Sequence, residues 1–152
     1  MGMQEYRHIL QQVCASTHGW NAAEILEGRP LRSNDVPVWL QYFEPADLCR
    51  IVVDLGALDG DFRATVWQMM LESNCTNTSS FLPVLSLNPA NGHAILVMHL
   101  SMTAFQKHSE YAGFSSFLSE SLAPVMESWR KGTEATLNLG HASGKMLVGG
   151  FA

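Results

Sequence analysis

Apolar residues recur along this chain with two different periods, one typical of helices and one typical of strands. Near the start, apolar residues recur every three or four positions: Tyr6, Ile9, Leu10 and Val13. This spacing predicts an amphipathic helix over residues 3–18. Residues 36–43 and 48–55 are instead rich in β-branched and aromatic side chains and predict two strands. A short apolar stretch at residues 22–26 is compatible with a third, brief strand.

The middle of the chain predicts a second helix over residues 62–74. Asp59 and Asp61 precede it and are residue types that cap a helix N-terminus. Its apolar residues fall on two stripes about a quarter turn apart: Phe62, Val66, Met69 and Met70 on one, Trp67 and Leu71 on the other. A stripe that wide predicts a helix that buries more than one side.

The second half of the chain predicts a hairpin and a last helix. Two apolar segments, residues 81–87 and 93–102, flank an Asn91-Gly92 turn, which supplies the positive φ angles of a tight hairpin. Apolar residues then recur at helical spacing from Phe114 to Trp129, with Pro124 expected to kink or divide the helix near Ser121. From residue 137 the chain is rich in glycine.

The order of these elements predicts the fold class. Strands that follow one another directly favour an antiparallel sheet, so we expect an α+β fold with three helices around it, in the order α-β-β-β-α-β-β-α. Residues 1–136 are expected to form a single domain, since 152 residues suit one domain, and residues 137–152 a flexible Gly-rich tail.

The composition indicates a surface that is unusually poor in charge. Only 15% of the residues are charged and 47% are hydrophobic, whereas about 25% charged is usual. A small domain of this kind leaves apolar surface uncovered, and such patches mark contact sites for partners. The alternative is a surface covered by Ser, Thr, Asn and Gln.

The charge pattern argues against several partners. The net charge is −5 and the basic residues are scattered, so neither nucleic acid nor an anionic membrane surface is an expected partner. The longest unbroken apolar run, residues 94–98, is too short for membrane insertion. Three distant cysteines and a start without an apolar leader predict a cytoplasmic protein without disulfides.

Candidate chemistry is sparse. The six histidines show no metal-ligand spacing, so no metal and no cofactor are expected. No nucleophile, base and orienting group occur together in a known pattern, and the chain is not expected to be an enzyme. A small hydrolase or transferase that uses Cys49 or Cys75 with a histidine remains the alternative.

Several short segments, taken in order, resemble a known family. They are Leu55-Gly56-Ala57-Leu58-Asp59, the helix end Met70-Leu71-Glu72-Ser73-Asn74, the strand Val84-Leu85-Ser86-Leu87-Asn88-Pro89, and an aromatic-rich helix closing at Trp129. Together they resemble the type III secretion chaperones typified by the chaperone of the translocated intimin receptor. The resemblance covers residues 50–130 and, more loosely, the first helix.

The resemblance implies a homodimer in the bacterial cytoplasm. Its middle helix and the strand after it would form the two-fold interface, and Trp67, Met70 and Leu71 are the interface residues implied. Contact with the export ATPase of the secretion system is left open. A dimeric adaptor of the same fold, without a role in secretion, is a further alternative.

The resemblance also implies a client, the N-terminal segment of a bacterial effector, which winds in extended form around the dimer and stays competent for export. Candidate client-binding residues lie on the first helix and on the strand of residues 36–43: Leu10, Val13, Val38, Leu40 and Tyr42. For each of these side chains taken singly, ordinary core packing is the favoured alternative.

Overall fold

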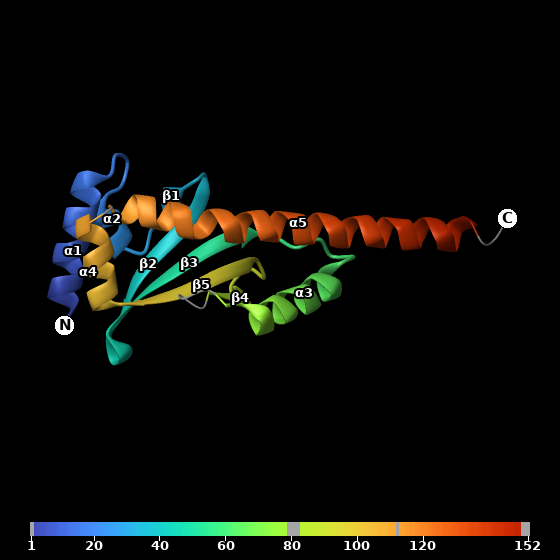
Figure 1. Cartoon of the computed structure of the whole chain (residues 1–152), viewed down its shortest axis with the longest axis horizontal. Coiled ribbons are helices and arrows are strands. Elements are labelled where there is room, and N and C mark those ends of the chain that lie inside the picture. Colours follow the sequence, from blue (N-terminus) through green and yellow to red (C-terminus); the bar gives the residue numbers. More distant parts are fainter. Residues whose placement is uncertain (1, 79–82, 112, 150–152) are drawn as a thin grey trace.

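The computed structural model describes residues 2–78, 83–111 and 113–149, with residues 111 and 139–149 described by their backbone only. These ranges form one antiparallel sheet with helices packed against it (Figure 1). The strands are β1 (Leu31–Ser33), β2 (Val36–Phe43), β3 (Leu48–Gly56), β4 (Val84–Leu87) and β5 (Ala94–Ser101). The helices are α1 (Met3–Ser16), α2 (Ala22–Leu26), α3 (Arg63–Thr76), α4 (Met102–Tyr111) and α5 (Phe114–Gly149).

The sheet has the order β1-β2-β3-β5-β4, and every neighbouring pair is antiparallel. This confirms the predicted α+β class and the antiparallel sheet. The expected three helices are too few, because the described ranges contain α2 and α4 in addition. The predicted hairpin is present as β4 and β5, with residues 81 and 82 of its predicted first strand outside the described residues.

Residues 22–26 form helix α2 and not the strand that their apolar character predicted. The physical reason is the residue before them. The Asn21 side chain accepts hydrogen bonds from the backbone N–H groups of Ala23 (2.9 Å) and Glu24 (3.3 Å), which caps the first turn. A short apolar segment alone does not distinguish a strand from a single helical turn.

Helix α3 begins without the cap that the sequence predicted. The Asp59 carboxylate accepts a hydrogen bond from the Asp61 backbone N–H at 3.0 Å, so it closes a turn ahead of the helix. Phe62 occupies the N-cap position and no side chain caps the helix. The aspartates therefore shape the loop between β3 and α3.

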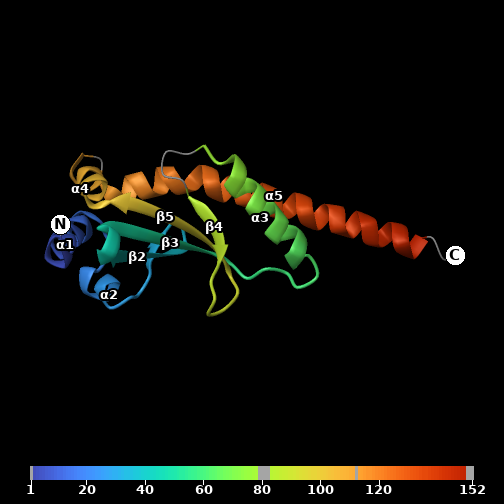
Figure 2. The same ribbon diagram turned by 90° about the horizontal axis from the view of Figure 1, so that it is seen from below.

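Helix α5 runs without a break from Phe114 to Gly149, so Pro124 neither divides it nor ends it. Pro124 itself is exposed, whereas Leu118 and Leu122 on another side of the helix are buried in the core. The segment expected to be a tail from residue 137 is helical to Gly149. A helix that is already nucleated extends at low cost, and Figure 2 shows α5 extending well beyond the sheet.

The core lies on one face of the sheet. Side chains alternate along the strands, so one residue in two faces the helices. Phe105 of α4 and Phe114 of α5 meet edge to face at the centre of this core, with ring centroids 4.8 Å apart. A smaller second core joins Val66 and Met70 of α3 to Ala94 of β5.

Candidate functional site: two exposed apolar surfaces

Four of the five residues expected to bind a client are part of the core. Leu10, Val13, Val38 and Leu40 are each at most 3% exposed. The prediction that they line a surface pocket is therefore wrong for the single chain, since their alternation in helix and strand directs them inward. The fifth, Tyr42, is half-buried.

Two contacts hold the Tyr42 side chain in place. Its ring stacks on that of Tyr6 with centroids 5.5 Å apart, and its hydroxyl donates to the Asp47 carboxylate at 2.7 Å. This hydrogen bond, with a smaller contribution from burial, raises the pKa of Tyr42 to about 12. Tyr42 therefore anchors the turn after β2.

The residues expected at a dimer interface divide into two groups. Trp67 is 41% exposed and Leu71 is 70% exposed, both on α3. Met70 is only 4% exposed and packs in the second core against Val66 and Ala94, so in the single chain it offers a partner much less surface than the other two. The i, i+3 and i+4 positions share one side of a helix, so it is the packing of the chain and not helix geometry that buries Met70 and leaves the other two exposed.

Trp67 and Leu71 border a groove between α3 and the edge strand β4. The groove has a volume of about 310 Å³, with Met70 also lining it from α3 and Leu85, Ser86 and Leu87 closing it on the strand side. We call Trp67, Leu71 and these three strand residues the α3–β4 surface. Large apolar side chains that gather in one exposed patch are typical of a contact surface.

A second apolar surface crosses the sheet on the face opposite to the core. The strand register places Trp39 of β2 opposite Val52 of β3, Val52 opposite Val97 of β5, and Val97 opposite Val84 of β4. None of these four belongs to either core, and Val84 is 46% exposed. We call them the open-face row. The sequence contains its signal, since apolar residues occupy both the odd and the even positions of β3 and β5.

Polar side chains border the open-face row on both sides. On one side, Arg50 donates from Nε to Nε2 of His99 at 3.2 Å, and its guanidinium carbon lies 5.5 Å from the Phe43 ring centroid. Partial burial, and then the charge of Arg50, lower the pKa of His99, which favours the neutral imidazole that can accept this bond. On the other side, His93 Nδ1 lies 3.0 Å from the Asp54 carboxylate.

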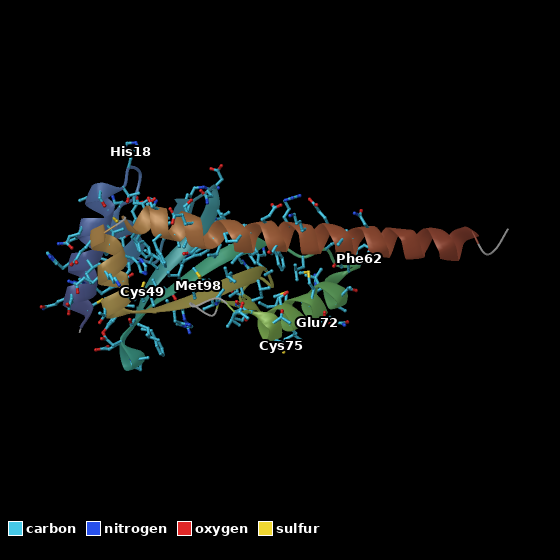
Figure 3. The ribbon with its side chains drawn as sticks, viewed as in Figure 1. His18, Cys49, Phe62, Glu72, Cys75 and Met98 are labelled. Atoms are coloured by element: carbon cyan, nitrogen blue, oxygen red, sulfur yellow. The ribbon has the colours of Figure 1, made fainter. Side chains whose placement is uncertain are left out.

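The cysteines offer little for catalysis. Cys49 lies in the core on β3, where burial raises the pKa of its thiol to about 12, and burial also raises the pKa of Cys14. Cys75 is exposed on α3, and Figure 3 shows it far from both Cys49 and His18. Over residues 2–78, 83–110 and 113–138, whose side chains the structure describes, no group of three His, Cys, Asp or Glu side chains is placed to hold a metal ion.

We expect the three thiols to differ in reactivity in the folded protein. Iodoacetamide at neutral pH should modify Cys75 first and leave Cys49 unmodified until the protein unfolds, because a buried protonated thiol is a poor nucleophile. Mass spectrometry of timed samples measures this, with Cys75→Ser as the control that removes the fast site. A cysteine that reacts much faster than free N-acetylcysteine would favour the hydrolase or transferase alternative.

Neither a protein-family model nor a curated protein matches this chain. Among the helices of the described residues, none is both long enough and apolar enough to cross a lipid bilayer. The functional argument therefore rests on the two surfaces themselves.

Proposed function

We propose that this protein is a homodimeric secretion chaperone of the bacterial cytoplasm, which holds the N-terminal segment of one or more effector proteins in extended form for export. The observation that carries the proposal is the presence of two separate apolar surfaces on a small, weakly charged chain. No nucleotide, metal or cofactor has a part in this function.

The α3–β4 surface is the one we assign to the second copy of the chain. It consists of one helix turn and one strand edge, so a two-fold axis could bring Trp67 and Leu71 of each protomer against the same residues of the other. Burial of one such side chain contributes about 1.5–3 kcal/mol. A self-complementary patch contributes each contact twice.

The open-face row is the surface we assign to the client. Strands lie about 4.8 Å apart, so a row across four strands is about 14 Å long and can receive two or three alternate side chains of an extended chain. An apolar row with polar borders suits a segment whose apolar residues alternate with polar ones. Trp39 is the largest side chain of the row and offers the widest contact.

A dimer would make this mode of binding effective. Ordering a disordered client costs about 2–5 kcal/mol and usually requires about 1,000–3,000 Å² of contact. One short row is too small to supply such an area. Two rows on one dimer, joined by the client chain itself, act at high effective concentration and increase the affinity without new contacts.

Two other functions are alternatives to the chaperone. A dimeric adaptor of the same fold would use the α3–β4 surface equally well, but its partner would be a folded domain. The thiol enzyme is disfavoured by the burial of Cys49 and by its raised pKa.

The test is co-expression with N-terminal segments of bacterial type III effectors. We expect one or more of these segments to co-purify in a stable complex while the bound segment gains protease protection without gaining a compact fold. The catalytic domains of the same effectors serve as controls and should not bind. Binding to a folded domain alone would favour the adaptor, and binding to no segment would contradict the proposal.

A further inference from the structure

Strand β4 is an edge strand of the sheet, since it pairs with β5 on one side only. An edge strand presents unpaired backbone groups that readily pair with a strand of another molecule. In an antiparallel pair, the backbone groups of every second residue face outward. For the first half of β4 that outward position is Leu85, and Pro83 is the next such position before it.

The end of helix α3 covers these outward groups. The Asn74 side chain donates from Nδ2 to the Leu85 carbonyl oxygen at 2.9 Å and accepts at Oδ1 from the Leu85 N–H at 2.8 Å. Asn77 donates from Nδ2 to the carbonyl oxygen of Pro83 at 2.7 Å. Pro83 itself has no N–H to offer.

The Asn74 amide thus occupies the place of a neighbouring strand. It supplies one donor and one acceptor to the same residue, which is the pair of contacts that an added antiparallel strand would make. All three hydrogen bonds are partly buried, so water does not replace them freely.

The opposite edge of the sheet is also covered in part. The Trp20 indole donates from Nε1 to the carbonyl oxygen of Arg32, the central residue of β1, at 3.1 Å. Strand β1 is only three residues long, and short edge strands are poor templates for pairing.

We propose that Asn74 closes the β4 edge against strand addition, so that the sheets of two molecules do not join along this edge. This inference goes beyond the proposed function, because it concerns how copies of this chain associate whether or not the client is an effector.

The alternative is that the amide merely fastens α3 to the sheet and that its loss acts only through stability. Two variants separate these readings. Asn74→Ala removes both hydrogen bonds and leaves the Leu85 groups open. Asn74→Asp keeps an acceptor for the Leu85 N–H, loses the donor to its carbonyl, and places a negative charge on the edge, which opposes strand pairing.

The experiment compares the weight-average mass of the full-length wild type and both variants by sedimentation velocity over a range of concentrations. We expect the weight-average mass of Asn74→Ala to be about twofold or more above that of the wild type, with an intermolecular β-sheet band in its infrared spectrum. The mass of Asn74→Asp should match that of the wild type. Denaturant titration ranks the stability of the variants.

Two results would overturn the proposal. One is an unchanged mass for a folded Asn74→Ala at every concentration. The other is that both variants assemble, and that the increase in mass of each follows its loss of stability. That result would mean that unfolding causes the assembly and an open edge does not. A monomeric wild type would contradict the proposed dimer but leave this comparison decisive.

Discussion

Replacement of Trp67 by Glu is expected to convert the proposed homodimer into a monomer that remains folded. Trp67 is 41% exposed in the single chain, so a charged side chain there can stay hydrated without disturbing the core. In a two-fold interface the same charge would be buried in both copies. A loss of about 2 kcal/mol for each copy becomes about 4 kcal/mol for the dimer, or about a thousandfold weaker association.

Sedimentation velocity measures this effect, and Leu26→Glu is its matched control. Leu26 is also an exposed apolar residue, 38% accessible, but it lies on α2 and outside the α3–β4 surface. We expect Leu26→Glu to keep the mass of the wild type and Leu71→Glu to behave like Trp67→Glu. A wild-type mass for both α3 variants would remove the α3–β4 surface from the interface.

Replacement of Trp39 by Glu is expected to weaken client binding about thirtyfold or more while the dimer persists. Trp39 is the largest side chain of the open-face row, and a tryptophan that dominates a contact typically contributes about 2 kcal/mol or more, which corresponds to about thirtyfold in affinity. Fluorescence anisotropy with a labelled effector segment that binds the wild type measures this change. Far-ultraviolet circular dichroism checks that the fold is retained.

Gln41→Glu is the matched control for this second variant. Gln41 lies on the same strand and the same face, so its replacement adds an equal charge but removes no apolar contact. We expect its affinity to remain within a few-fold of the wild type. If Trp39→Glu and Gln41→Glu bind equally well, the client binds elsewhere and the open-face row has another role.

The fold could be predicted from the sequence where the pattern of side chains was long and regular. The bounds of β2 match the predicted residues 36–43, and α1 and the hairpin lie where the spacing and the Asn-Gly turn placed them. The errors concern short or unusual segments. Five apolar-rich residues before Glu27 form a helix because of the Asn21 cap, and Pro124, which is itself exposed, does not break α5.

The surfaces were harder to predict than the fold. The two stripes of α3 correctly indicated a helix with more than one apolar side, but only the packing shows that Met70 faces inward and Leu71 outward. In β2 the side chains of Val38 and Leu40 point into the core and are buried, whereas Trp39 between them lies on the open face. Where both faces of a strand are apolar, alternation cannot tell which one a helix covers.

The two apolar surfaces favour contacts through side chains, and the closed β4 edge opposes strand pairing between molecules. Exposed apolar residues and unpaired sheet edges both promote aggregation, and a chaperone needs the first without the second. Hydrogen bonds from α3 to Leu85 would allow the apolar α3–β4 surface to lie beside an edge strand and still bind only one second copy of the chain.

The molar mass of the unmodified protein in solution tests the central claim most directly. Light scattering coupled to size-exclusion chromatography should give twice the 16.8 kDa of the single chain over a wide range of protein concentration. A mass of one chain at every concentration would mean that Trp67 and Leu71 are exposed for some purpose other than a second copy, and it would contradict the account.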